Sequence, residues 1–166
     1  MMIIAVKLGQ QISDSKILKS LKAVDFMPRK LLLVEDEQLQ EQLLLQFCRK
    51  DLKAGKYEII YAATGEEALQ RIEADRDHEI ELIIADLKMP AARIDGWELI
   101  KVLNREHIDI KTIIVTAVGS ENDFTEEERK NILFFLDKMT SLETLKFLLE
   151  FALNIPDKFD INSQKV

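Results

Sequence analysis

Cysteine, histidine, glycine and proline are all scarce in this chain. Of its 166 residues, one is cysteine, two are histidine, five are glycine and three are proline. One cysteine excludes an internal disulfide scaffold and a Cys-rich zinc module, and two histidines leave little room for a histidine-based metal site. The glycine and proline counts exclude collagen-like and low-complexity chains. A reducing cytoplasm is the expected location, which suits the single thiol of Cys48.

Long apolar runs and positive charge are also lacking. No stretch approaches the ~18 apolar residues of a membrane span, and the apolar start, residues 1–8, lacks the basic start and the small-residue cleavage site of a signal peptide. The net charge is −7 at pH 7. It argues against direct binding to nucleic acid or to an anionic membrane, and favours cations or basic partner surfaces. The length predicts one domain with room for an extension.

Short apolar runs alternate with helical patterns from Lys30 onward. Five runs are predicted as strands: Leu31–Val34, Tyr57–Ala62, Leu82–Ala85, Thr112–Val115 and Leu133–Leu136. Four are continuous, as expected for strands buried on both faces, whereas Tyr57–Ala62 is mixed and fits an edge strand. Helices are predicted in the intervals, with three starts marked by the capping signatures Thr64/Glu67, Thr125/Glu128 and Thr140/Glu143. This alternation predicts an α/β fold with a parallel sheet.

Polar residues follow four of the five predicted strands. They are Glu35 and Asp36 after the first, Asp86 after the third, Thr116 after the fourth and Lys138 after the fifth; the second contributes nothing obvious. Because ligands bind at the carboxyl ends of parallel strands, these groups are expected to share one site. Three carboxylates in a small space repel one another unless a cation joins them, and Mg²⁺ prefers such oxygen ligands.

The same set of residues suits phosphoryl transfer. Asp86 is placed to act as a carboxylate nucleophile that forms an acyl phosphate. Thr116 can donate a hydrogen bond to the phosphoryl group, and Lys138 can neutralise its charge.

Residues 30 to about 153 resemble the receiver domain of two-component response regulators, the family of the single-domain chemotaxis regulators. The segments that carry the resemblance are LLLVEDE (31–37), LIIADLKMP (82–90), DG (95–96), IIVTA (113–117) and FFLDK (134–138). The resemblance implies a flavodoxin-like (βα)5 fold whose five-stranded parallel sheet has the order 2-1-3-4-5. It also implies the phosphoacceptor Asp86 and a Mg²⁺ site formed by Glu35, Asp36, Asp86 and the backbone carbonyl of Lys88.

The resemblance assigns roles to further residues. Thr116 and Lys138 become the catalytic partners of Asp86, and Phe135 becomes the aromatic switch. The two positions that tune acyl-phosphate lifetime in the family are Lys88 and Val118. Our hypothesis is that Lys88 shields the phosphoryl group and that Val118 offers no polar group to orient water, which gives slow autohydrolysis.

The chain departs from the family pattern at three places. Met139 stands where the family usually has a proline after the lysine, in a cis bond; a trans bond and a re-shaped loop are expected here because a cis bond before a non-proline residue costs about 2.5–4 kcal/mol. The loop from Pro90 to Gly96 is two residues longer than is usual in the family. Asn131-Ile132 replaces the usual Gly-Ala.

The last predicted helix, Leu142–Leu153, is apolar around most of its circumference, with one narrow polar stripe of Lys146, Glu150 and Asn154. A sheet covers only one side of a helix, so a second subunit, a partner or the N-terminal extension is expected to cover the rest. A homodimer is the first interpretation.

The domain boundaries are predicted as an extension at 1–29, a receiver domain at 30–154 and a tail at 155–166. The extension has five basic and two acidic residues, whereas the receiver-like part has 16 basic and 26 acidic residues. Lys16–Val24 is typical of a short amphipathic helix that could dock on the last helix. Alternatively, Met27 is the true start.

These observations predict a stand-alone response regulator that accepts a phosphoryl group from a histidine kinase or phosphotransfer protein. Output is expected through contacts of the fourth helix, fifth strand and fifth helix with a downstream protein, with no enzymatic activity beyond self-phosphorylation and dephosphorylation. One alternative is a phosphorylation-independent interaction module, which Met139 favours. Another is a small hydrolase with an aspartyl nucleophile, which needs a general acid where Lys88 stands.

Overall fold

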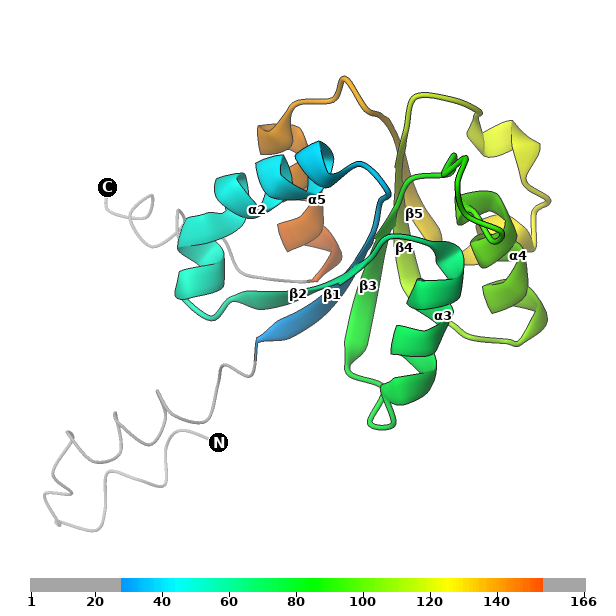
Figure 1. The fold of residues 1–166 in the computed structure, drawn as a ribbon, viewed down its shortest axis with the longest axis horizontal. Coiled ribbons are helices and arrows are strands. Elements are labelled where there is room, and N and C mark those ends of the chain that lie inside the picture. The colour runs from blue at the N-terminus through cyan, green and yellow to red at the C-terminus, as the bar shows by residue number, and fades with distance from the viewer. Residues whose placement is uncertain (1–27, 154–166) are drawn as a thin grey trace, which may run out of the picture.

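A computed structural model describes residues 28–153, and its five strands form one sheet (Figure 1). The strands are β1 (Arg29–Val34), β2 (Tyr57–Ala62), β3 (Ile80–Ala85), β4 (Lys111–Thr116) and β5 (Ile132–Asp137). All pairs are parallel, in the order β2-β1-β3-β4-β5. The predicted sheet, its order and the edge position of β2 are confirmed. The expected helix at 16–24, the tail at 155–166 and Asn154 lie outside the described residues.

Within residues 28–153, four α-helices lie on the two faces of the sheet (Figure 1). They are α2 (Gln38–Lys53), α3 (Gly65–Ala74), α4 (Gly96–Arg105) and α5 (Leu142–Ala152). Leu31 and Leu33 of β1 pack in the cluster with α2 and α5, whereas Leu32 and Val34 pack in the cluster with α3 and α4. Successive side chains of a strand point to opposite faces, which explains why the buried strands read as continuous apolar runs. None of the described helices is both long and apolar enough to cross a bilayer.

The helix expected between the fourth and fifth strands is not formed. Residues 117–131, all of them described, contain only two short 3₁₀ helices, Glu121–Asp123 and Glu128–Asn131. The capping signature itself is present, because the Thr125 N–H donates to Glu128 at 2.8 Å and the Glu128 N–H donates to Thr125 Oγ1 at 3.2 Å. Since β5 begins at Ile132, the chain has room for fewer than two helical turns after this cap. The prediction of five helices was wrong at this place.

β5 is therefore less buried than predicted. It is the second edge strand, and the 117–131 segment supplies no α-helix to cover it. Leu133 is 39% exposed, so the interpretation of this run as buried on both faces was wrong. The segment is instead fastened to α4, where the ring of Phe124 stacks on Trp97 at a centroid distance of 4.7 Å.

Helix α5 begins at Leu142 as predicted, but its N-cap lies one residue later than the predicted cap. Ser141, rather than Thr140, is the N-cap, and its Oγ accepts from the Thr144 N–H at 3.2 Å. The polar stripe of α5 faces α2: Lys146 Nζ lies 2.5 Å from Asp51, and Glu150 lies 3.1 Å from Lys56 Nζ.

The sheet covers only part of the apolar surface of α5, as expected. Leu145, Leu149 and Ala152 are buried against the sheet, whereas Phe147 and Phe151 are 59% and 65% exposed.

Candidate functional site

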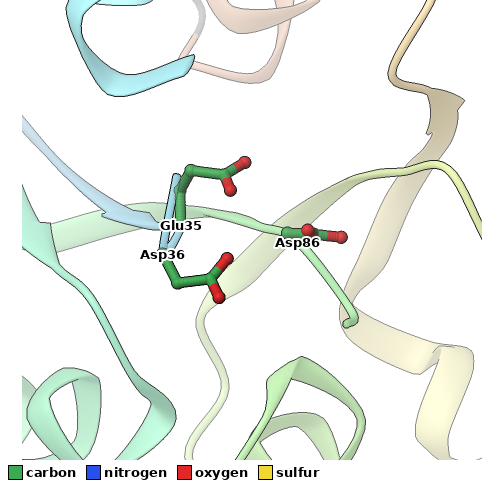
Figure 2. A group of neighbouring side chains, drawn as sticks. All are labelled: Glu35, Asp36 and Asp86. Atoms are coloured by element: carbon green, nitrogen blue, oxygen red, sulfur yellow. The ribbon is translucent and has the colours of Figure 1, made fainter. Parts of the chain in front are cut away.

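Three carboxylates meet at the carboxyl edge of the sheet. Glu35 and Asp36 follow β1, and Asp86 follows the neighbouring strand β3; Figure 2 shows all three side chains from close by. Oxygens of the three groups lie within 4.8 Å of one another. Glu35 and Asp86 are buried, with 6% and 5% of their surface exposed. The structure thus brings together the three residues predicted to bind a cation.

Asp86 is held in place by the backbone around it. Its N–H donates to the Val34 carbonyl at 2.9 Å, which extends the β1–β3 ladder by one residue. Gly96, the first residue of α4, lies against it: a Cβ at Gly96 would stand 2.0 Å from the backbone oxygen of Asp86. Only glycine allows this approach. Asp95 caps the same helix by accepting from the Glu98 N–H at 3.1 Å. The Asp-Gly pair therefore begins α4 in direct contact with the backbone of Asp86.

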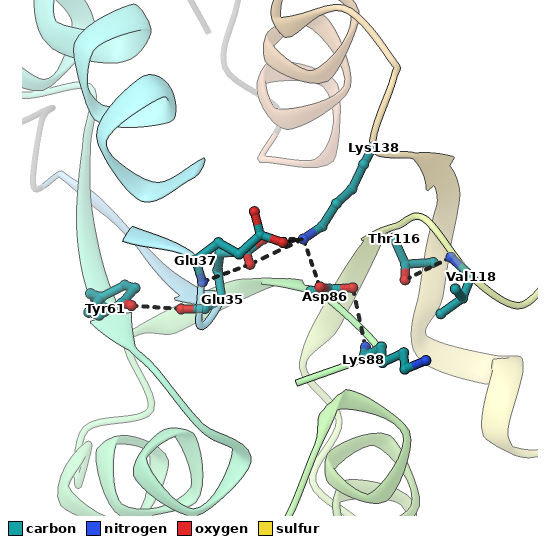
Figure 3. A network of polar contacts seen from close by, with 8 residues as sticks. All are labelled: Glu35, Glu37, Tyr61, Asp86, Lys88, Thr116, Val118 and Lys138. Atoms are coloured by element: carbon teal, nitrogen blue, oxygen red, sulfur yellow. Dashed lines mark hydrogen bonds and ion pairs between the residues drawn. The ribbon is translucent and has the colours of Figure 1, made fainter. Parts of the chain in front are cut away.

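Lys138 reaches into the carboxylate cluster from the end of β5 (Figure 3). Its Nζ lies 2.7 Å from Asp86 Oδ2, 3.1 Å from Glu35 Oε2 and 3.5 Å from Glu37 Oε1. Its backbone N–H donates to the Thr116 carbonyl at 3.1 Å and so continues the β4–β5 ladder. Burial opposes the charged form, but the hydrogen bonds to Asp86 and Glu35 outweigh it and raise the pKa of Lys138 above its ordinary value.

Burial has the opposite consequence for Glu35. Desolvation raises the pKa of its carboxyl above the ordinary value, although the Glu37 N–H and Lys138 counteract part of the effect. A buried carboxylate whose negative charge is only partly compensated is stabilised by an added cation. The oxygen-only donor set of Glu35, Asp36 and Asp86 is the kind that Mg²⁺ prefers, so these residues fit a magnesium ion.

Met139 does not displace the lysine that precedes it. No cis peptide bond occurs within residues 28–153, which confirms the expected trans bond. The Met139 N–H donates to Asp137 Oδ1 at 2.7 Å, a bond that proline cannot make. The Thr140 N–H then closes a turn onto the Asp137 carbonyl at 2.8 Å. This turn leaves the Lys138 side chain directed at Asp86.

The remaining predicted residues are divided between two places. A cavity of about 370 Å³ beside Asp86 is lined by Asp36, Glu37, Asp86, Lys88, Pro90, Thr116, Ala117, Val118 and Lys138. Within it, the Lys88 N–H donates to Asp86 Oδ1 at 3.2 Å. Thr116 Oγ1 accepts from the Val118 N–H at 3.4 Å. Phe135 does not line this cavity; it packs half-buried in the cluster that contains Trp97 and Phe124.

Two residues of the site were not foreseen. Tyr61 Oη donates to the backbone carbonyl of Glu35 at 2.7 Å, so β2 does contribute to the site. Glu37 adds a third carboxylate beside Lys138. The acidic run 35–37 was a visible signal for Glu37. Nothing local marks Tyr61, whose contact depends on the register that pairs it with Leu33.

Comparisons with known proteins point to one family. Residues 31–150 match the family model of the response regulator receiver domain. Among curated proteins, the chain is 33% identical over 97 residues to the alkaline phosphatase synthesis transcriptional regulatory protein PhoP of Bacillus subtilis, covering 58% of this chain and 37% of PhoP. It is 35% identical over 97 residues to the response regulator GtcR of Aneurinibacillus migulanus, covering 58% of this chain and 36% of GtcR. The match thus spans little more than a third of each relative, 37% and 36%.

Solved structures show the same relationship. The signal receiver domain of a protein described as a Luxo repressor from Vibrio parahaemolyticus superimposes with a TM-score of 0.64 at 30% identity, covering 77% of this chain and 92% of that domain. A CheY-like receiver domain protein from Methanospirillum hungatei gives 0.62 at 22% identity, covering 76% and 94%. The second likeness shows the fold alone.

Proposed function

The chain belongs to the family of response regulator receiver domains, and from this premise we propose that it accepts a phosphoryl group on Asp86 from a histidine kinase or a phosphotransfer protein. The observation that carries the proposal is the position of Asp86. Its buried carboxylate lies beside those of Glu35 and Asp36 and 2.7 Å from Lys138 Nζ, and it lines a cavity of about 370 Å³. A phosphoryl group has room there and meets groups that compensate its charge.

The transfer forms an O–P bond and breaks a P–N bond. An oxygen of the Asp86 carboxylate attacks the phosphorus, the P–N bond of the donor phosphohistidine breaks, and the imidazole nitrogen keeps the electron pair and takes a proton from water. Lys138, 2.7 Å from Asp86, neutralises charge on the phosphoryl oxygens. Thr116 is placed to donate its hydroxyl hydrogen. The protein is thus a phosphoacceptor and not an enzyme for a separate substrate.

Glu35, Asp36 and Asp86, with the backbone carbonyl of Lys88, would hold a magnesium ion. When bound, Mg²⁺ supplies positive charge to the phosphoryl oxygens during transfer. The protein's own part is to keep the three carboxylates within reach of one another. Tyr61 contributes by holding the Glu35 carbonyl, and Gly96 contributes by allowing α4 to approach Asp86.

Phosphorylation is proposed to act on a partner surface rather than on DNA. Rearrangement of Thr116 and Phe135 would alter β5 and α5, whose exposed rings Phe147 and Phe151 suit contact with a downstream protein or a second copy of the chain. The fourth-helix part of the expected surface is here the 117–131 segment with its 3₁₀ turns. The cytoplasm, which keeps the single thiol reduced, is the proposed location.

Incubation with acetyl phosphate and Mg²⁺ tests the proposal. Intact-mass measurement should show one added phosphoryl group, lost in Asp86→Asn and kept in the control Asp77→Asn, whose side chain is exposed. Omission of Mg²⁺ should prevent the addition. A protein that stays unmodified, or an Asp86→Asn protein that is still modified, would contradict the proposal.

The lifetime of the acyl phosphate is a separate prediction. The exposed side chain of Lys88 lies on the rim of the cavity and Val118 offers no polar group there, so autohydrolysis is proposed to be slow. Lys88→Ala should lose phosphate at least about twofold faster, because one cation that faces the phosphoryl group is removed. An unchanged half-life would refute this role.

One observation still supports the alternative of a phosphorylation-independent interaction module. Phe147 and Phe151 are exposed in the unmodified chain, so a partner could bind them constitutively. Met139 no longer supports it, because Lys138 still reaches Asp86. Binding of a downstream protein that is equal for the wild type and for Asp86→Asn, with and without acetyl phosphate, would favour this alternative.

A further inference from the structure

A groove lies at the amino ends of the strands, on the edge of the sheet opposite to Asp86. Its volume is about 770 Å³, and it lies between the ends of α3 and α4. The floor is apolar and consists of Leu69, Ile72, Ile80, Ile108 and Ile110. Ile80 is 4% exposed, whereas the other four are only half-buried. These side chains belong to the core cluster under α3 and α4, yet solvent still reaches them.

The rim of the groove is predominantly acidic. It carries the carboxylates of Glu73, Asp75 and Asp109, with Arg76 as the single permanent cation among its lining residues. An apolar floor with an acidic rim fits a segment that presents apolar side chains flanked by lysines.

The described chain begins at the border of this groove. Lys30 of β1 pairs with Ile80, which is part of the floor, and its Nζ bonds to the neighbouring Glu79. Residues that precede Pro28 therefore join the sheet at the same edge as the groove. Because an extended chain spans at most about 3.6 Å per residue, Val24 can lie anywhere within about 14 Å of Pro28.

The segment that precedes Pro28 has the complementary chemistry. In the stretch KILKSLKAV (16–24), Ile17, Leu18, Leu21 and Val24 share one face of a helix, and the three charged residues are all lysines. A helix of nine residues is about 14 Å long. We propose that residues 16–24 dock as an amphipathic helix in the groove between α3 and α4, and that lysine side chains outside its apolar face reach the acidic rim.

This docking goes beyond phosphoryl transfer and is independent of it. The groove and the Asp86 cavity have no lining residue in common and lie at opposite ends of the strands. The occupied groove would also leave the exposed rings of α5 free for another partner.

Disulfide trapping in the full chain tests the location. The native thiol of Cys48 is buried and does not interfere. Ser20→Cys and Lys22→Cys flank the apolar face of the helix on its two sides, and each is combined in turn with Glu73→Cys and Asp109→Cys on the rim. The comparison variant combines Ser20→Cys with Phe147→Cys on α5. Mild oxidation should give an intramolecular bond to the rim in at least one pairing and little bond to α5. Preferential trapping to Phe147→Cys, only intermolecular bonds, or no bond would overturn the proposal.

A second measurement uses substitutions within the segment. Leu21→Asn lies on the apolar face and Ala23→Asn lies on the opposite face, so both introduce the same residue. Leu21→Asn should lower Tm by about 2–4 °C, since roughly 1 kcal/mol of burial is lost, and should speed amide exchange at 69–72 and 108–110. Ala23→Asn should change neither. Both should accept phosphate from acetyl phosphate like the wild type, which separates this proposal from the function of Asp86. Equal effects of the two variants, or none, would overturn the docking.

Discussion

The side chain of Lys138 is the counterion that allows Asp86 and Glu35 to stay buried together. It is 13% exposed and contacts both carboxylates. Attraction inside a protein is strong, but so is the cost of removing charges from water. At Glu35 burial outweighs the two compensating contacts and raises the pKa of the carboxyl, so its negative charge is not fully compensated. An additional positive charge at the site would therefore stabilise the buried carboxylates.

Removal of this ammonium should destabilise the protein in a pH-dependent way. Lys138→Met leaves Asp86 and Glu35 without their cation and should reduce the free energy of unfolding at pH 7 by about 3 kcal/mol. A carboxyl whose folded pKa is raised favours the folded state below its unfolded pKa and loses that contribution as pH rises through the folded pKa. The deficit should therefore shrink as pH falls toward the ordinary value of 4.5 for Glu35.

Urea unfolding at several pH values measures this deficit. Lys53→Met, an exposed lysine at the end of α2, is the control and should have little effect at any pH. A loss that is the same at pH 4.5 and pH 7 would show that packing, rather than charge compensation, explains the variant.

At the scale of elements, the segment between β4 and β5 depends on one aromatic contact. Phe124 is 4% exposed and stacks on Trp97. Gly119, with a φ of +84°, lies so close to this pair that a Cβ would stand 2.6 Å from the Trp97 ring. With no α-helix in residues 117–131, this packing and the contacts of the 3₁₀ turn Glu128–Asn131 hold the segment against α4.

Phe124→Ala should therefore release the segment. The expected cost is about 3–5 kcal/mol, the range for a buried aromatic replaced by alanine. Emission of Trp97, the single tryptophan, should shift to longer wavelength as water reaches the ring. Glu121→Ala, an exposed position on the same segment, should change neither quantity. An unchanged Trp97 spectrum in Phe124→Ala would contradict this account of the segment.

A network of charges lies at the contact between α2 and α5, beside their apolar packing. Asp51 is 7% exposed, and its two oxygens lie 2.7 Å from Lys56 and 2.5 Å from Lys146. Burial alone would raise the pKa of this carboxyl, but the two ammonium groups lower it below the ordinary value of 3.8. A depressed folded pKa means that the ion pairs stabilise the fold above pH 3.8 and that this contribution is lost as pH falls through the folded pKa.

Asp51→Asn should expose this dependence. At pH 7 the variant should lose about 1–3 kcal/mol, because two lysines lose a buried charged partner. Acid titration followed by circular dichroism should show the two proteins converging at the most acidic pH values. Asp77→Asn, an exposed carboxyl, serves as control. A constant difference down to acid pH would rule out the ionised carboxylate as the cause.

Local sequence predicts some elements better than others. β1, β3 and β4 were found because a strand buried on both faces reads as a continuous apolar run, and the strand-end residues followed from the strand assignments. The Thr125 signature misled because a cap specifies where a helix begins and not how far it runs; the start of β5 at Ile132 limits it. The contact of Tyr61 with Glu35 could not be predicted, because it depends on strand register.

At the scale of the whole molecule, three surfaces lie apart from one another. The Asp86 cavity occupies the carboxyl edge of the sheet and the apolar groove occupies the opposite edge. The exposed rings belong to α5, which lies on one face of the sheet (Figure 1). Separation allows each to bind its own partner. The excess of acidic residues is concentrated in residues 30–153, whereas the 1–29 segment is basic, so the two parts of the chain attract one another.

The α5 surface is the one proposed to join two copies of the chain. Phe151 is 65% exposed and contacts Phe134 edge-on at 6.1 Å, and Phe147 adds a second exposed ring. Aromatic side chains of this kind are the usual anchors of interfaces, and loss of one costs 2 kcal/mol or more, about 30-fold in Kd. Phe147→Asp should weaken self-association by at least that factor. Leu39→Asp, which places the same charge on an equally exposed apolar residue of α2, should not. Sedimentation over a range of concentrations, with and without acetyl phosphate and Mg²⁺, measures both variants. A wild-type chain that stays monomeric under every condition would leave α5 to a different protein, and equal weakening by Leu39→Asp would move the interface to α2.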